Sequence, residues 1–343
     1  MLSRKRLLPL LLMIVVLVYW YFKRPDPLVT IEGQTFGSIA WHIKYKDKQQ
    51  RNFKPAVDSL LMVFNHALSH YIPDSELSLF NHSDGSQSYK SPFFYPVLEV
   101  SKQVYEWSHG AYNPAVMPLV NAWGFGPQHE VQPDSAVIDS LLQFTDFNLV
   151  EFDYNYVRKK DPRVQLDFSA SAKGYAVDII ANFLRTKGIT DYFVEIGGEV
   201  VCAGTNARGE PWKIGIIDPA SDILNQRFIA TVQLTDRAVA TSANNFNYRV
   251  VDGKRYSHTI DPVSGYPVQR NILSASVFAD ECLLADALAT ACMVMGMEPA
   301  KEMLANIPGV DALLIYTDKK GQVVIYMTEG IKPFVSLTDR PQS

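Results

Sequence analysis

The chain has 343 residues, of which 47% are hydrophobic and 20% are charged, a composition typical of a folded globular protein and not of a disordered one. Its formal net charge is -4, and no sustained stripe of Lys and Arg runs along it. This argues against a nucleic-acid-binding protein, because phosphate contacts need a concentrated basic face. We expect a small molecule or a protein as substrate.

Residues 1–25 have the pattern of a targeting segment. The basic residues Arg4, Lys5 and Arg6 precede an apolar run over residues 7–22, which ends at Lys23. The run is slightly shorter than the roughly 20 residues of a spanning helix but longer than a usual signal-peptide core, and no small-residue cleavage site follows. The pattern favours an uncleaved anchor helix in the inner membrane, with the body on the periplasmic or other extracytoplasmic side. A cleaved signal peptide is the alternative.

The body is predicted to be one α+β domain over residues 36–335, after a linker at 26–35 and before a tail at 336–343. Apolar residues at helical spacing, or long apolar runs, predict helices over 55–71, 94–109, 172–186, 281–297 and 298–306. Short runs rich in β-branched and aromatic residues predict strands over 38–45, 192–202, 212–217, 228–234, 238–241, 274–279, 312–317 and 323–327. Because helices and strands mix without strict alternation and hairpins join several strands, we expect mixed, largely antiparallel sheets with packed helices.

The stretch LDFSASAKGYAVD, residues 166–178, predicts a place for an anion. A strand ends near Asp167, four small residues follow, and Lys173 opens a helix. Free N–H groups at a helix N-terminus and a lysine ammonium together suit a phosphate group. The alternative is a tight strand-to-helix turn with a solvated lysine.

The stretch ECLLADALATACMVMGM, residues 281–297, is apolar nearly all round and predicts a buried helix. Asp286 and Thr290 are four residues apart and therefore lie on one face of it. A buried carboxylate is costly unless it is paired or coordinated, and oxygen donors on successive turns suit Mg²⁺. The alternative is a hydrogen bond from Thr290 back to its own helix, with Asp286 near a buried cap.

Two glycine-containing stretches indicate close approach of a ligand. Gly197 and Gly198 interrupt the predicted strand at 192–202, where glycine marks either a nearby ligand or a bulge. Residues 110–127, GAYNPAVMPLVNAWGFGP, mix aromatics with Gly and Pro, and these aromatics form either a stacking wall for a planar ring or part of the core.

The stretch RYSHTIDPVSGYP, residues 255–267, places a titratable imidazole near a carboxylate. His258 is a candidate general base, and Asp261 could orient it or bind a cation. The alternative is a polar hairpin loop with a hydrogen-bonded histidine.

Six motifs in this order give the chain a specific resemblance. SELSLFN, GAYNPAVMPLVNAWGFGP, LDFSASAKGYAVD, EIGGEV, AVATSANNFNYRVVDGKRYSHTIDPVSGYPV and ADALATA together resemble the ApbE family, the FAD:protein FMN transferases, over roughly residues 33–335. The resemblance implies an α+β enzyme that takes FAD, binds its pyrophosphate with Mg²⁺, transfers FMN to a Thr or Ser hydroxyl of an acceptor protein and releases AMP. It also implies an acceptor within a membrane redox complex.

The resemblance further implies three sets of site residues. The metal ligands would be Asp286, Thr290 and the backbone carbonyl of Ala170. The residues that bind FAD would be Phe36, Tyr71, Ala111, Tyr112, Asn113, Asp167, Lys173 and Ile260. The catalytic residues would be Lys173, His258 and Asp261.

Three stretches depart from the family's pattern. Asn113 stands where aspartate is common, residues 169–172 replace a frequent glycine-containing turn, and residues 36–38, Phe-Gly-Ser, stand where Met-Gly-Thr is usual. Two other functions remain open from the residues alone. The first is an FAD pyrophosphatase that gives FMN and AMP, and the second is an exported flavin-binding protein.

Overall fold

The computed structural model describes residues 26–126, 133–221, 225–243, 248–251, 254–257 and 259–338, and the side chains of residues 244–258 are outside this description. The predicted targeting segment, residues 1–25, also lies outside it. Within the described ranges, no helix has the length and the apolar character needed to cross a membrane.

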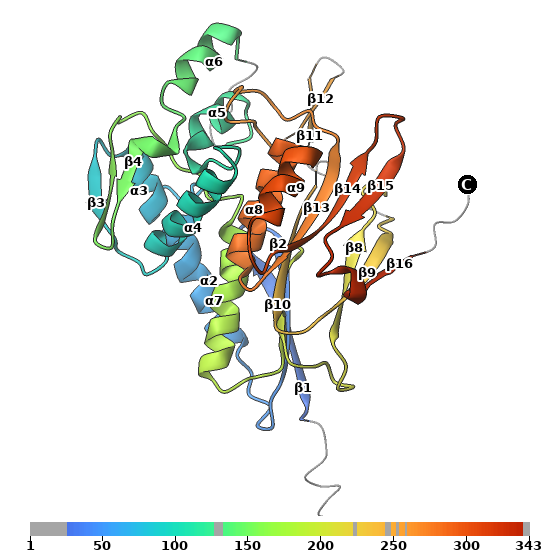
Figure 1. The fold of residues 1–343 in the computed structure, drawn as a ribbon. Coiled ribbons are helices and arrows are strands. Elements are labelled where there is room, and N and C mark those ends of the chain that lie inside the picture. The colour runs from blue at the N-terminus through green and yellow to red at the C-terminus, as the bar shows by residue number, and fades with distance from the viewer. Residues whose placement is uncertain are drawn as a thin grey trace, which may run out of the picture.

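The centre of the fold is an eight-stranded sheet in the order β1-β2-β6-β7-β10-β13-β14-β15 (Figure 1). Every neighbouring pair in it is antiparallel, which confirms the predicted pairing. Its strands are β1 Leu28–Thr35, β2 Ile39–Lys46, β6 Tyr192–Ile196, β7 Glu199–Ala203, β10 Arg237–Ala243, β13 Ile272–Ala279, β14 Asp311–Thr317 and β15 Val323–Met327. Three smaller sheets comprise β16 Val335–Leu337 with β9 Phe228–Leu234 and β8 Trp212–Ile217; β3 Ser86–Ser88 with β5 Tyr156–Lys159 and β4 Val150–Phe152; and β11 Tyr248–Val251 with β12 Lys254–Ser257.

The main sheet is covered on both faces. Alternate residues of β10 point to opposite sides, so that Ala238 and Ala240 join the larger core with the helices, while Val239 joins a second core with β8 and β9. The helices lie together on one side of the sheet (Figure 1). They are α2 Lys54–Leu68, α3 Glu76–His82, α4 Phe94–Trp107, α5 Met117–Ala122, α6 Ser135–Leu142, α7 Ala172–Thr186, α8 Cys282–Met295 and α9 Met297–Ala305, with the short 3₁₀ helices η1 Pro114–Val116 and η2 Phe147–Leu149. The 3₁₀ helix η3 Lys332–Phe334 instead contacts β9, next to the second core.

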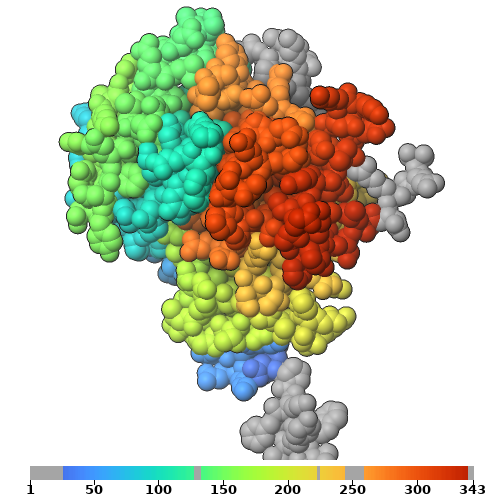
Figure 2. Space-filling model, in the orientation of Figure 1, coloured from blue at the N-terminus to red at the C-terminus, as the bar shows by residue number. Residues whose placement is uncertain are grey.

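The predicted buried helix is α8, which packs against α4, α7, β10 and β13. Eleven of its 14 residues are buried, as its uniformly apolar sequence requires. Asp178 of α7 accepts hydrogen bonds from the backbone N–H groups of Cys282 and Leu283, at 2.9 and 2.8 Å, and so binds α7 to the N-terminus of α8. The space-filling view shows the α4 region lying directly against α8 (Figure 2).

Three sequence predictions are corrected by the fold. Most of the predicted linker at 26–35 is β1, which pairs with β2 along its whole length; only Ile31 is buried in it, so the apolar alternation of a strand is missing. The predicted tail at 336–343 begins inside β16, which pairs with β9. Gly197 and Gly198 are not within a strand. They form the two-residue turn between β6 and β7, with φ of 60° and 99°, the positive values that such hairpin turns need.

Candidate active site

A cavity of about 730 Å³ opens where α7 and α8 meet the loops on either side of them. A cavity of this size is in the range that takes a small molecule or a cofactor. Its wall includes most of the residues that the sequence predicted. They are Tyr71, Ala111, Tyr112, Asn113, Asp167, Ala170, Lys173, Ile260, Asp286 and Thr290.

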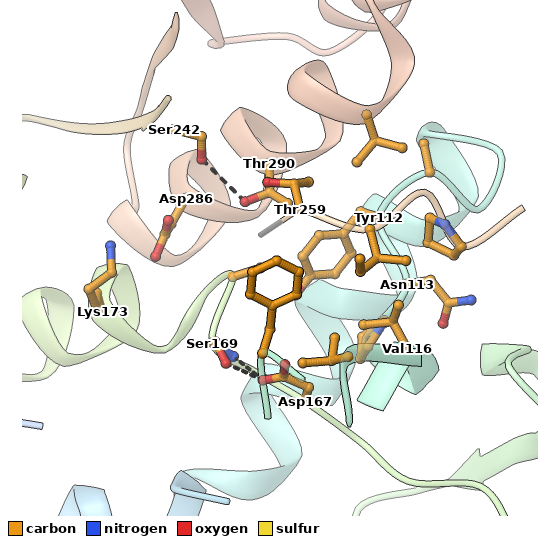
Figure 3. Close-up of a pocket in the computed structure, with 18 of the residues that line it drawn as sticks. Tyr112, Asn113, Val116, Asp167, Ser169, Lys173, Ser242, Thr259, Asp286 and Thr290 are labelled. Atoms are coloured by element: carbon orange, nitrogen blue, oxygen red, sulfur yellow. Dashed lines mark hydrogen bonds between the residues drawn. The ribbon is translucent and has the colours of Figure 1, made fainter. Parts of the chain in front are cut away.

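Figure 3 shows Lys173, Asp286 and Thr290 gathered at one end of the cavity. Glu199, which pairs with Lys173, also lines the cavity, and we call these four residues the charged end. Asp286 is only 3% exposed, and its Oδ2 accepts a hydrogen bond from the backbone N–H of Gly174 at 3.0 Å. Thr290 Oγ1 lies 3.2 Å from the hydroxyl of Ser242 on β10. Asp286 and Thr290 therefore line the cavity from successive turns of α8, as predicted from their spacing.

Lys173 makes an ion pair with Glu199, the first residue of β7. Burial opposes the charge on Lys173, but the nearby Glu199 and Asp286 carboxylates outweigh it and raise the pKa of the ammonium. Burial also raises the pKa of Asp286, and it raises the pKa of Glu199 to about 8, although Lys173 opposes both shifts. Burial thus disfavours two carboxylate charges beside one ammonium, and a cation bound to Asp286 would offset that cost.

The oxygen atoms at the charged end fit Mg²⁺. In a regular helix the Gly174 N–H would donate to the carbonyl of Ala170, but here it donates to Asp286, and the Ala170 carbonyl accepts no hydrogen bond from the described residues. Carboxylate, hydroxyl and carbonyl oxygens are ligands that Mg²⁺ takes, with water and substrate phosphate completing six positions. No group of three or more His, Cys, Asp or Glu in the described part of the chain could hold a metal, which is consistent with a set that contains one carboxylate.

The opposite end of the cavity is built on an ion pair that sequence reasoning missed. His70 Nδ1 lies 3.3 Å from Asp167 Oδ1, and both side chains are buried. Burial raises the pKa of Asp167, but His70 and Ser169 lower it more, to about 2. Burial lowers the pKa of His70, but the charge of Asp167 outweighs burial and raises it. The ring of Tyr71 contacts that of His70 at a tilt of 46°, with ring centroids 4.1 Å apart, and Tyr71 is 63% exposed. His70 directly precedes the predicted Tyr71, but nothing in the sequence links it to Asp167.

The 111–113 segment forms the wall between the two ends. Tyr112 is buried, and its hydroxyl lies 3.0 Å from the Ser171 hydroxyl beneath the start of α7. Asn113 uses its side chain within the protein, because Oδ1 accepts from the Ala115 N–H at 2.9 Å and Nδ2 donates to the Thr145 carbonyl at 3.1 Å. Apolar residues complete this wall. They are Val116, Val120, Phe125, Ile260 and Pro262.

Two predicted site residues that the structure describes, Phe36 and Asp261, are not among those that line the cavity. Phe36 lies in the turn between β1 and β2 and packs against Phe64, with ring centroids 6.1 Å apart. The Asp261 carboxylate accepts from the Val263 N–H at 3.0 Å and lies 3.5 Å from Arg270, so it serves its own loop. His258 lies outside the described residues.

The comparisons agree with this geometry. The model of the ApbE family matches residues 37–314. The chain belongs to the ApbE family. It is 35% identical over 324 residues to the FAD:protein FMN transferase of Vibrio cholerae, a match that covers 92% of this chain and 95% of that protein. The FAD:protein FMN transferase of Escherichia coli K12 is 32% identical over 332 residues, covering 91% and 93%.

Solved ApbE structures share the fold. The flavin transferase ApbE from Vibrio cholerae superposes with a TM-score of 0.79 at 33% identity and covers 90% of this chain and 100% of its own. The apo form of the flavinyl transferase ApbE from Pseudomonas stutzeri gives a TM-score of 0.78 at 31% identity, covering 90% and 97%. The mixed α+β fold with antiparallel sheets, expected from the motifs, is therefore confirmed.

Proposed function

We propose that this protein is an FAD:protein FMN transferase that moves FMN from FAD to a Thr or Ser hydroxyl of an acceptor protein and releases AMP. The observation that carries the proposal is the charged end, where Lys173, Asp286 and Thr290 lie together in the cavity wall. Relatives named FAD:protein FMN transferase, at 30 to 35% identity over most of the chain, support it.

The chemistry is an attack of the acceptor hydroxyl oxygen on the flavin-side phosphorus of FAD. A new P–O bond to the acceptor forms, the pyrophosphate P–O bond breaks, AMP leaves with its electron pair, and the hydroxyl proton passes to a base. Lys173 provides positive charge for the phosphoryl oxygens. Asp286, Thr290 and the Ala170 carbonyl would hold Mg²⁺, which supplies Lewis-acid charge at the phosphates.

We propose that His258 is the base, because it lies in the motif RYSHTIDPVSGYP, residues 255–267. Replacing His258 with Ala tests this role, because loss of a base slows transfer at saturating FAD while the dissociation constant of FAD changes little. An equal loss in both would make His258 a binding residue instead.

The apolar segment at residues 1–25 supports a further proposal, that an anchor helix holds the catalytic domain on the periplasmic or extracytoplasmic face of the inner membrane, near a membrane redox complex that contains the acceptor. Protease added to intact spheroplasts would digest the domain in that arrangement. Protection of the domain until lysis would contradict it.

The decisive experiment mixes the full chain with FAD, Mg²⁺ and an acceptor protein that bears an accessible threonine. We expect covalent FMN on the acceptor by mass spectrometry, AMP in equal amount, and loss of both with EDTA. Free FMN and AMP without labelled acceptor would indicate an FAD pyrophosphatase. FAD that stays bound and uncleaved would indicate a flavin-binding protein.

A further inference from the structure

Lys173 has two buried carboxylates nearby but contacts only one of them. Its ammonium pairs with Glu199, whose side chain is 1% exposed, while no ion pair joins Lys173 to Asp286 in the part of the chain that the structure describes. Asp286 still acts on Lys173 through space, because its charge contributes to the raised pKa of the ammonium. The position of this one ammonium therefore determines how much negative charge Asp286 presents to the cavity.

The turn between β6 and β7 fixes the Lys173–Glu199 pair. With positive φ at Gly197 and Gly198, β7 begins at Glu199 directly opposite Ile196. A Cβ on Gly197 would lie 2.7 Å from Ile39 Cγ2 and 3.5 Å from Lys173 Cδ, so the bare backbone of the turn passes close to the lysine stem. The turn therefore restricts Lys173 from one side while Glu199 binds its end.

Burying the Glu199 side chain at this position costs free energy. Its Oε1 pairs with Lys173, but its Oε2 is buried and has no hydrogen-bond partner among the residues that the structure describes. Burying a carboxylate with one oxygen unpaired costs more free energy than burying a neutral Gln or an apolar residue at the same place. Lys173, at the start of α7, could pair with Asp286 instead. The presence of a second buried carboxylate at Glu199 therefore requires an explanation.

We propose that Glu199 is a positioning residue that holds the Lys173 ammonium away from Asp286 and so leaves the Asp286 carboxylate available to a divalent cation. Without the charge of Glu199, the ammonium has one buried carboxylate left to pair with, which is Asp286. In a low-dielectric site that pairing is strong, and it would both neutralise Asp286 and repel an incoming cation. The inference rests on the proposed function only for the identity of the cation ligands.

The test measures Mg²⁺ binding to the full-length protein by calorimetry, without FAD or acceptor. It is run at pH 8.5, because the pKa of Glu199 is raised to about 8. We expect Glu199→Gln to bind Mg²⁺ about tenfold more weakly than wild type, which corresponds to about 1.4 kcal/mol. The double variant Glu199→Gln with Lys173→Met should regain at least wild-type affinity, because the competing ammonium is gone. A purely structural role for Glu199 predicts no such rescue.

Glu195 provides a matched control on the same hairpin. Its carboxylate accepts from the Gly198 N–H at 2.7 Å and lies 2.7 Å from His42, and it is not among the residues that line the cavity. Glu195→Gln should therefore leave Mg²⁺ affinity unchanged, and thermal unfolding of every variant checks that the fold is retained.

Two results would overturn the inference: wild-type Mg²⁺ affinity in Glu199→Gln, or a double variant as weak as Glu199→Gln alone. Failure of the proposed function is separate, because it would appear as absent FMN transfer by a wild-type protein that still binds Mg²⁺.

Discussion

At the charged end of the cavity the side chains come from helices and strands that pack into the core, whereas at the opposite end, which we call the loop end, Tyr71 and Asp167 come from loops. Asp286 and Thr290 project from α8, and Glu199 from β7, so the packed core fixes their backbones. Tyr71 and Asp167 lie outside regular elements, and Tyr71 is 63% exposed. We infer that the two ends have different roles: the charged end performs chemistry that needs fixed charges, and the loop end binds the rest of the ligand.

The two ends also treat charge differently. At the loop end one imidazole faces one carboxylate, and the pKa of Asp167 falls to about 2, so the pair is balanced within the protein. At the charged end two carboxylates share one ammonium, and the pKa of Asp286 is raised by burial. A cation site needs a carboxylate that the protein does not fully pair, as at the charged end. An ion pair that is balanced within the protein, as at the loop end, is suited to fix the position of its side chains.

The largest effect should come from the charged end. We expect Asp286→Asn to lower the rate of FMN transfer by about 10³-fold, roughly 4 kcal/mol, because it removes the charged cation ligand. The Asn oxygen can still accept from the Gly174 N–H, so the melting temperature should change by only a few degrees. Acceptor labelling followed by mass spectrometry measures the rate. Wild-type activity in this variant would show that Asp286 binds no essential cation.

Lys173→Gln should cost about 10²-fold in kcat/KM for FAD, the usual loss when one group that stabilises phosphoryl charge is removed. Its Mg²⁺ affinity should stay at or above the wild-type value, since the ammonium competes with the cation. Steady-state kinetics and calorimetry on the same preparation separate the two quantities. A parallel loss of Mg²⁺ binding would mean that Lys173 supports the cation site instead of opposing it.

At the loop end the expected effect is smaller and of a different kind. Asp167→Asn leaves the His70 imidazolium without its counterion and removes one contact that the resemblance assigns to FAD. We expect KM for FAD to rise about tenfold with kcat nearly unchanged, because binding is lost equally in ground and transition states. A drop in kcat at constant KM would show that the loop end takes part in the chemical step, and would contradict the proposed separation of roles.

The same pair predicts a pH dependence of stability. The lowered pKa of Asp167 stabilises the fold above its unfolded value of about 3.9, and this contribution is lost as pH falls towards 2. The raised pKa of His70 stabilises the fold below about 6.5 and this is lost as pH rises through the folded value. The unfolding free energy of wild type should therefore exceed that of Asp167→Asn most between about pH 4 and 6.5, by about 2 kcal/mol. Denaturant titrations at pH 3, 5 and 8 measure it, and a constant difference would argue against the ion pair.

Local patterns in the sequence predicted what depends on local geometry. The bounds of α7, β8 and β9 agree with those predicted from local sequence patterns. Asp286 and Thr290 share a face because residues four apart on a helix do so. The pairs Lys173–Glu199 and His70–Asp167 were not predicted, since each joins distant segments through the fold. The edge strand β1 was mistaken for a linker because its partner, and not its own pattern, makes it a strand.

The smallest effect concerns Phe36, which the resemblance places at FAD and the structure places beside Phe64. We expect Phe36→Ala to leave KM for FAD within about twofold of wild type while the melting temperature falls by a few degrees, because a half-buried aromatic contact is lost. Alanine keeps the cost of the positive φ of 50° at this turn, so no relief of backbone strain offsets the loss. Tyr71→Ala is the matched comparison, since Tyr71 lines the cavity and its removal should raise KM. If Phe36→Ala raised KM as much as Tyr71→Ala, the FAD site would extend to the β1–β2 turn, and the loop end would be larger than the cavity wall indicates.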